Sequence, residues 1–179
     1  MADDEEYPVD REEFERCVGD LLTGQAVMTL CTASDGQPWA SDVYFAPLGY
    51  RLVFYSSPAS RHMRSLLDNS ACAATVHPTV SSWTDIHGLQ MSGTVRALRN
   101  EDEAEQVAAA YLGKFPFARD LMSSPGAAPA DARQDRLQRV VGHVFVPSYI
   151  RYLDNRMGFG AKFSMLLQDS AITGGVRDE

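Results

Sequence analysis

The sequence lacks the features of a membrane or secreted protein. Its 179 residues contain no run of about 18 apolar residues, so no membrane-spanning helix is expected. Residues 1–6 carry four acidic side chains, whereas a signal peptide begins with basic residues. Cys17, Cys31 and Cys72 are far apart and form no Cys-x-x-Cys pair, which argues against disulfides and zinc. These absences predict a cytoplasmic protein with no membrane partner.

Positive charge and several common motifs are also scarce. The formal net charge is −8, and an acidic surface repels phosphate backbones, so nucleic acid is not an expected partner. No G-x-G-x-x-G motif is present, which excludes a dinucleotide-binding Rossmann domain. The sequence also contains no G-x-S-x-G motif, which would indicate a hydrolase. His62, His77, His87 and His143 are never three or four residues apart, so no metal site is predicted.

Short β-rich segments dominate what is present. They are separated by turns and a few helices, without internal repeats and without alternating β and α units, which favours a barrel or sandwich over a doubly wound sheet. The expected strands are Ala26–Ala33, Trp39–Pro47, Arg51–Ser57, Ala71–Val76, Gly88–Arg99, Leu137–Val146 and Tyr149–Leu153, with Pro147 as a break. We expect a disordered acidic segment at 1–8, one domain at 9–170 and a flexible tail at 171–179.

Local signals place several element boundaries. Asp10 is a good N-cap for a helix that ends at Gly24, with Glu13 three residues further on as in a capping box. The segment Ser34–Gln37 contains Asp-Gly and predicts a hairpin. Gly93 lies inside a strand, which indicates a bulge or a close backbone approach. Ser123–Asp131 has no periodic apolar pattern and is predicted to be a loop.

The segment Tyr55–His62 carries the clearest chemical signal. It runs from a strand into a helix whose predicted N-cap is Ser57, with Pro58 at the first helical position. Backbone N–H groups of a first turn point out of the helix with the positive end of its dipole. Nearby serine hydroxyls, the Arg61 guanidinium and the His62 imidazole complete a compact anion site that suits a phosphate monoester. The alternative is that the serines only cap the helix and Arg61 is solvated.

A second unusual segment runs from Asp154 to Lys162. Gly158 and Gly160 flank Phe159 and precede Lys162, an arrangement that would let the backbone approach a ligand closely. A plain turn is the alternative interpretation.

Taken in order, four stretches resemble the pyridoxamine 5'-phosphate oxidase-like split barrels, and in particular the YhbP-type branch. The stretches are Ser56 to His62, Gly88–Gly93, Phe115–Arg119 and Asp154–Lys162. The resemblance implies a mainly β (α+β) fold: a six-stranded antiparallel Greek-key split β-barrel with peripheral helices. It also implies a homodimer with two FMN sites between the subunits. The loop Ser124–Arg136 is longer than the resemblance would suggest.

The same resemblance implies a set of cofactor-binding residues. The phosphate of FMN would lie at the Ser56–His62 turn, and the flavin ring would lie along the neighbouring strands, with the 158–162 segment supplied by the other subunit. The implied cofactor-binding residues are Ser41, Asp42, Val43, Phe54, Tyr55, Ser56, Ser57, Ser60, Arg61, His62, Gln90, Gly158, Phe159 and Gly160. Lys162 is the one candidate for contact with substrate or the flavin edge, and hence for a catalytic role.

The resemblance favours a flavin-dependent oxidoreductase that acts on a small molecule by hydride transfer through flavin N5. His62 stands where many members carry lysine, and the basic residues that bind pyridoxamine phosphate in the true oxidases have no counterpart here, so that substrate is not expected. A reductase that uses the deazaflavin F420 is one alternative. A non-catalytic protein that binds or senses flavin or haem is another, because a haem site needs an axial His, Cys or Met.

Overall fold

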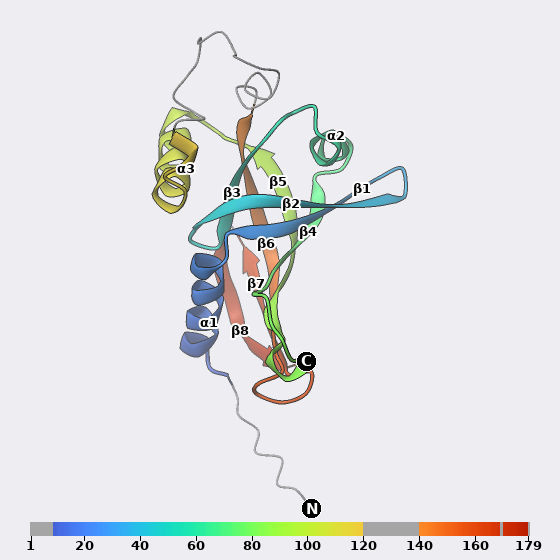
Figure 1. Ribbon diagram of the computed structural model, residues 1–179, viewed down its shortest axis with the longest axis vertical. Coiled ribbons are helices and arrows are strands. Elements are labelled where there is room, and N and C mark those ends of the chain that lie inside the picture. Colours follow the sequence, from blue (N-terminus) through green and yellow to red (C-terminus); the bar gives the residue numbers. More distant parts are fainter. Residues whose placement is uncertain (1–8, 120–139, 169, 179) are drawn as a thin grey trace, which may run out of the picture.

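The computed structural model describes residues 9–119, 140–168 and 170–178. These residues form one antiparallel sheet of eight strands with three α-helices around it (Figure 1). The predicted disorder of residues 1–8 and the predicted loop at 123–136 lie outside the described residues.

Six strands of the described chain close into a barrel. The neighbours follow the order β3-β2-β1-β4-β5-β6, and β3 also pairs with β6, which closes the ring. The strands are β1 (Val27–Ser34), β2 (Gln37–Leu48), β3 (Arg51–Ser56), β4 (Ala71–Val76), β5 (His87–Ala97) and β6 (Val141–Asp154). This arrangement confirms the predicted six-stranded antiparallel Greek-key barrel.

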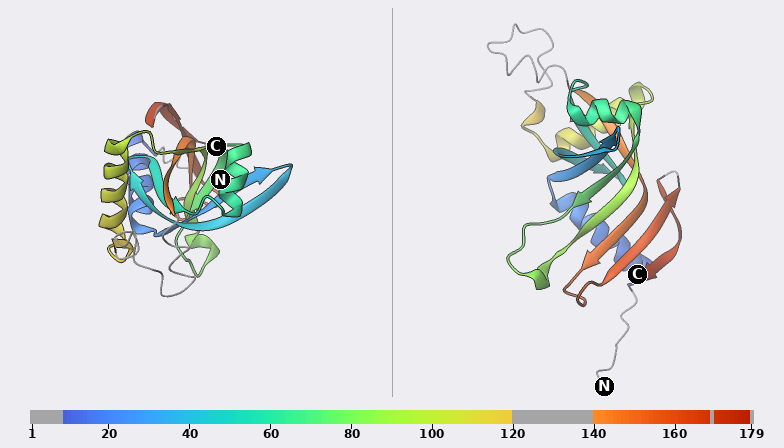
Figure 2. Two further views of the ribbon diagram at one scale, coloured as in Figure 1. Left: turned by 90° about the horizontal axis from the view of Figure 1, so that it is seen from above. Right: turned by 90° about the vertical axis from the view of Figure 1, so that its right-hand side faces the viewer.

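Two further strands extend the sheet beyond the barrel. β7 (Lys162–Gln168) pairs with β6, and β8 (Ala171–Asp178) pairs with β7 (Figure 2). The prediction of a flexible tail from residue 171 was therefore wrong. β8 contains Gly174 and Gly175, which are weak strand formers, so its sequence has little local signal. It becomes a strand because β7 offers it an edge with unpaired backbone groups.

The helices begin where polar side chains cap them. Asp10 accepts a hydrogen bond from Glu13 N (2.8 Å) and starts α1 (Arg11–Gly24), as predicted. Asn100 does the same for α3 (Glu101–Lys114) through Glu103 N (2.9 Å). α2 (Arg61–Asp68) lies beside the barrel end at which β3 finishes, and a single 3₁₀ turn covers Trp83–Asp85. None of the helices in the described residues is long and apolar enough to cross a bilayer.

The apolar residues form two packed clusters. The larger fills the barrel and takes in one face of α1, including Phe14, Val18 and Leu22. The smaller lies on the outer face of the barrel under α3 and consists of Ala46, Val53, Val107, Tyr111, Phe115, Ala118 and Val144. Among the described residues, α1 and α3 cover the same side of the barrel and α2 packs against β1, so no described helix lies over the outer faces of β4 and β5 (Figure 1).

A bulge keeps β6 continuous where the sequence predicted a break. The β5–β6 register shifts between Ser92 and Gly93, and Gly93 pairs with Pro147. A Cβ on Gly93 would lie 2.2 Å from the carbonyl oxygen of Val146, so only glycine allows this approach. Pro147 therefore lies inside β6 at the irregularity, where a missing N–H is tolerated, and the predicted interruption of the strand was wrong.

The predicted hairpin at Ser34–Gln37 is confirmed. Asp35 and Gly36 both have positive φ, 51° and 72°, which is the combination that a tight two-residue hairpin turn requires. The turn joins β1 to β2 over the full register from Val27↔Tyr44 to Ser34↔Gln37. It thereby sets which residues of β2 face outward.

Candidate functional site

Three predicted site residues meet where β3 ends and α2 begins. The hydroxyl of Ser56, the last residue of β3, lies 2.7 Å from His62 Nε2 and 3.3 Å from the Ser60 hydroxyl. The Ser60 hydroxyl is also 3.1 Å from His62 Nε2. Ser56 is buried, whereas Ser60 and His62 are half-buried. The structure therefore gathers two hydroxyls and an imidazole into one cluster, which we call the serine–histidine corner.

The N-cap of α2 is Ser60, not Ser57 as the sequence predicted. The Ser60 hydroxyl accepts from Met63 N (3.4 Å), and Ser57 O accepts from Ser60 N (2.9 Å). Residues 57–60 therefore form a turn before the helix, with Pro58 inside that turn. Serine is a favoured N-cap residue, so both Ser57 and Ser60 were suitable by residue type. The path of the chain after β3 places Ser60 at the start of the helix. The positive end of α2 remains at the corner, three residues later than expected.

A second histidine, His143, lies beside this corner. It pairs with Phe54 across β3 and β6, with ring centroids 5.5 Å apart, and its buried Nε2 has no hydrogen-bond partner among the described residues. Burial lowers the pKa of both His62 and His143 below the ordinary histidine value, and His62 lowers the pKa of His143 further. Both imidazoles are therefore neutral near pH 7. The sequence spacing could not reveal His143, because 81 residues separate it from His62 in the chain.

Arg61 points toward β2. Its guanidinium carbon lies 4.0 Å from the centroid of the exposed Trp39 ring, and Trp39 Nε1 donates to the Ser41 hydroxyl (2.8 Å). Arg61, Trp39 and Ser41 therefore form a connected polar surface between α2 and β2. Trp39 is the residue that joins these two predicted site residues.

Asp42 and Gln90 lie in one cross-strand row on the outer face of the barrel. Asp42 pairs with Thr29, Thr29 with Thr75, and Thr75 with Gln90. The Thr29 hydroxyl donates to Asp42 Oδ1 (2.7 Å). Arg151 on β6 completes the row and donates to Gln90 Oε1 through Nε (2.9 Å) and Nη2 (2.5 Å). This face carries no helix, so the row is open to a ligand or another chain.

Other predicted residues lie away from that face. Phe54 is fully buried in the barrel core, so its side chain contributes packing rather than a contact surface. Tyr55 points to the opposite side and packs edge-on against Tyr111 of α3, with ring centroids 4.9 Å apart. Val43 is half-buried against the core. Alternation along β2 and β3 separates these side chains even though their positions are adjacent in sequence.

The 155–161 turn lies at the other end of the molecule from α2 (Figures 1 and 2). Gly158 and Gly160 adopt positive φ, 147° and 76°. The Phe159 side chain is 85% exposed and contacts Trp83 edge-on at 5.5 Å, and Lys162 is the first residue of β7. One chain therefore cannot bring Lys162 to its own serine–histidine corner.

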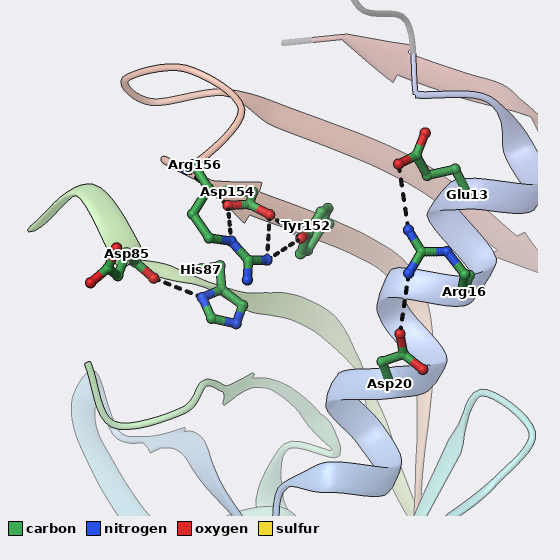
Figure 3. A network of polar contacts seen from close by, with 8 residues as sticks. All are labelled: Glu13, Arg16, Asp20, Asp85, His87, Tyr152, Asp154 and Arg156. Atoms are coloured by element: carbon green, nitrogen blue, oxygen red, sulfur yellow. Dashed lines mark hydrogen bonds and ion pairs between the residues drawn. The ribbon is translucent and has the colours of Figure 1, made fainter. Parts of the chain in front are cut away.

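A buried carboxylate holds this turn in place (Figure 3). Asp154 accepts from the Arg156 backbone N (3.0 Å), from Arg156 Nε (2.8 Å) and Nη2 (2.6 Å), and from the Tyr152 hydroxyl. Burial acts to raise the pKa of Asp154, but these hydrogen bonds outweigh it and hold the pKa below the ordinary value. Asn155 adds a bond from Nδ2 to Trp83 O (2.7 Å), so the glycine turn is tied to the segment before β5.

Metal binding has no support from the described residues. They contain no group of three or more His, Cys, Asp or Glu side chains that could hold a metal ion. The cysteines are free and half-buried.

The closed six-stranded antiparallel barrel with its peripheral helices is a split β-barrel. The family model for pyridoxamine 5'-phosphate oxidase matches residues 14–142, and the chain therefore belongs to the pyridoxamine 5'-phosphate oxidase family. Its sequence is 29% identical over 147 residues to the UPF0306 protein YhbP of Escherichia coli, covering 81% of this chain and 88% of that one. The YhbP-type branch predicted from sequence is thus supported.

Solved structures of similar fold carry different ligand descriptions. A heme binding protein from Mycobacterium smegmatis matches with a TM-score of 0.64 and 20% identity, over 85% of this chain and 56% of that chain. A FAD-binding protein from Mesorhizobium loti matches with a TM-score of 0.57 and 18% identity, over 75% of this chain and 90% of that chain. At these identities the matches establish the fold.

Proposed function

We propose that this protein binds FMN as a homodimer and serves as a flavin-dependent oxidoreductase for a small molecule. The observation that carries the proposal is the serine–histidine corner at the N-terminus of α2, with the Arg61–Trp39–Ser41 surface beside it. Family membership supports the choice of a flavin, and the FAD-binding neighbour from Mesorhizobium loti has the same fold. The cytoplasmic location stays a prediction from the sequence.

The corner offers the donors that a phosphate monoester requires. Ser56 and Ser60 supply hydroxyls, the first-turn amides of α2 supply N–H groups, and Arg61 supplies the charge. His62 is neutral and contributes a hydrogen bond rather than a charge. Arg61 would supply a full positive charge to the phosphate, and to do so its guanidinium must move from the Trp39 face. Affinity should depend strongly on this residue.

The outer face of the barrel suits a flat ring and a second subunit. The row Asp42, Thr29, Thr75 and Gln90 supplies donors and acceptors along a face that no helix covers. Arg151 donates two hydrogen bonds to Gln90 Oε1 and so fixes the orientation of the carboxamide. Because a guanidinium cannot accept a hydrogen bond, the Gln90 NH₂ group points away from Arg151. We place the edge of the flavin ring along this row.

A partner subunit would complete the site. In one chain the 155–161 turn and α2 lie at opposite ends, so Lys162, Phe159 and the two glycines can reach a phosphate corner only in another copy. Asp154 and Asn155 hold the turn rigid and so position Lys162 for that contact. Bound FMN would supply hydride transfer through its N5, and Lys162 would bind the substrate or the ring edge.

Haem binding is the second candidate, and two histidines of this chain favour it. His77 Nδ1 lies 3.1 Å from Pro78 O, and His87 Nδ1 lies 2.7 Å from Asp85 O. A carbonyl oxygen only accepts, so each Nδ1 carries the proton and each Nε2 keeps a lone pair for a metal. Both histidines line a pocket of about 200 Å³ next to Gln90. The haem-binding neighbour shares the fold.

The absorbance spectrum of freshly purified protein separates these candidates. A flavin, the deazaflavin F420 and a haem absorb at different wavelengths, and the apoprotein can then be titrated with FMN while flavin fluorescence is followed. Arg61→Gln should weaken FMN binding by about tenfold or more, because it removes a charge-assisted hydrogen bond. Arg11→Gln, on the exposed side of α1 and away from the corner, removes the same charge and is the matched control.

Catalysis and assembly have their own measurements. Lys162→Ala should slow NADH- or NADPH-dependent bleaching of the flavin while FMN stays bound. Sedimentation of the FMN complex should give the mass of a dimer. A monomeric FMN complex would remove Lys162 from the site, and equal binding by the Arg61→Gln and Arg11→Gln variants would overturn the phosphate assignment.

A further inference from the structure

A second pocket of about 660 Å³ lies on the side of the barrel that carries α1 and α3. Its lining comes from the β2–β3 turn, the end of β5 and the segment that follows it, the middle of β6 and the β7–β8 turn: Leu48, Gly49, Tyr50, Arg51, Arg96, Arg99, Val146 and Ser170. None of these residues belongs to the serine–histidine corner or to the Asp42–Gln90 row. Its volume falls within the usual range for small-molecule sites.

The charges at this pocket are unbalanced in a protein whose net charge is −8. Three of the described lining residues are arginines and none is acidic. The nearest carboxylate, Glu103 of α3, pairs with Arg96 Nη2 (2.6 Å) and Arg51 Nη1 (3.3 Å). One carboxylate therefore faces three guanidiniums, so the pocket keeps an excess of about two positive charges.

The anchoring of α3 does not account for all three arginines. Arg96 binds both oxygens of Glu103, and the Arg99 backbone N donates to the same carboxylate (2.7 Å). These bonds hold the helix on the barrel. The Arg99 guanidinium, by contrast, has no hydrogen bond or ion pair within the described part of the chain, and Arg51 keeps one amino group for another acceptor. Two cationic groups are thus available to a ligand.

Polar groups of a different kind complete the lining. Tyr50 and Ser170 carry hydroxyls, and Leu48 and Val146 supply an apolar wall. Burial raises the pKa of Tyr50, and the negative charge of Glu15 on α1 raises it further. The Glu15 carboxylate is itself paired with Arg11 Nε (2.7 Å). Glu15 is therefore already engaged by an arginine outside the pocket.

We propose that this pocket is a second binding site, for a small molecule that carries a doubly charged anionic group such as a phosphate monoester or a dicarboxylate. The planar fork of a guanidinium matches both groups, and the two available guanidiniums, Arg51 and Arg99, would hold a dianion better than a single carboxylate. The site is separate from the proposed flavin phosphate corner, so it could take a substrate or an effector.

The test is calorimetric titration of the purified protein with inorganic phosphate and with succinate at pH 8, in a buffer free of other polyvalent anions. We expect saturable binding of millimolar strength at this pocket for at least one of the two probes, and weaker binding of acetate. Arg99→Gln should weaken it by about fivefold or more. Arg99 is exposed and its guanidinium has no hydrogen bond or ion pair with the described residues, so this variant should fold, which thermal unfolding verifies.

Two control variants test whether phosphate binds at this pocket rather than elsewhere on the protein. Arg177→Gln removes the same charge from the exposed face of β8 and should leave phosphate binding unchanged. Arg61→Gln removes the charge from the flavin corner, so the phosphate binding that this variant retains reports the second pocket alone. Absence of saturable binding up to about 50 mM, or loss of binding in Arg61→Gln with retention in Arg99→Gln, would overturn the proposal, whatever the FMN titration shows.

Discussion

The Arg61 guanidinium lies over the face of Trp39, 4.0 Å from the ring centroid, and joins the first turn of α2 to β2. Such a contact between exposed groups contributes about 0.5–1 kcal/mol. It keeps Arg61 at the protein surface between two predicted parts of the site instead of free in solvent. The indole also orients Ser41 through its N–H.

Replacing Trp39 should therefore change ligand binding more than stability. We expect Trp39→Leu to weaken FMN binding by about threefold, because Arg61 loses the surface that orders it. The free energy of unfolding in urea should change by less than about 0.5 kcal/mol, as expected for an exposed position. Trp39→Phe keeps an aromatic face and should retain most of the affinity. An unchanged FMN affinity in Trp39→Leu would show that the contact has no part in binding.

The ion cluster around Glu103 should make α3 sensitive to this one side chain. Glu103 is 8% exposed and accepts bonds from Arg51, Arg96 and the Arg99 amide. Glu103→Gln should lower the free energy of unfolding by about 2 kcal/mol, because it leaves guanidiniums without their counter-charge. Glu105→Gln, on the exposed face of the same helix, is the control. Equal stability of the two variants would mean that the cluster is not an anchor.

The same carboxylate should contribute to acid stability. Hydrogen bonds from Arg96 lower the pKa of Glu103 to about 2, with burial acting in the opposite direction. A depressed carboxyl pKa contributes stability that is present above the ordinary value near 4.5 and is lost as the pH falls toward 2. In urea melts the wild type should thus lose more stability than Glu103→Gln between pH 5 and pH 2.5. Parallel losses would count against this origin.

The neutral histidines predict a loss of stability in a milder acidic range. Burial lowers the pKa of His143 and His62 in the folded protein, so the unfolded chain binds protons first as the pH falls through about 6.5. Stability should therefore be full above pH 7 and should decline toward pH 5. His143→Phe, which can pack on Phe54, should reduce that decline. An identical pH profile for this variant would exclude His143 as a cause.

The bulge at Gly93 should tolerate no side chain. An added Cβ would meet Val146 O at 2.2 Å and Pro147 Cα at 2.8 Å, both backbone atoms of the paired strand. Gly93→Ala should destabilise the protein by about 3 kcal/mol or more, measured as the midpoint of urea unfolding. Gly113→Ala in α3 has open space around it and should be neutral or stabilising by up to about 1 kcal/mol. A mild effect at Gly93 would mean that β6 can shift away.

Elements with strong local chemistry were predictable from sequence. Asp10 caps its helix as expected, and Asp35-Gly36 makes the hairpin that pairs β1 with β2. The strand β4 has the predicted bounds, Ala71–Val76. Caps and tight turns depend on a few neighbouring residues, so a short window of sequence contains the information needed.

Elements whose partners lie far away in the sequence were not predictable in this way. β8 forms against the edge of β7, Pro147 stays within β6 because Gly93 lies opposite, and the N-cap of α2 moves to Ser60 because β3 leaves the sheet at Ser56. Each of these outcomes depends on a neighbour that the local sequence does not specify.

By itself the sequence determined the strand pattern, the capped helices and the ordered stretches that identify the family. Only the tertiary structure decided that Ser56, Ser60 and His62 share one corner with His143 beside it, that Phe54 is buried, and that three arginines line a separate pocket. The physical reason is that barrel closure through β3 and β6 brings together residues about 90 positions apart, and strand alternation then selects which side chains share a face.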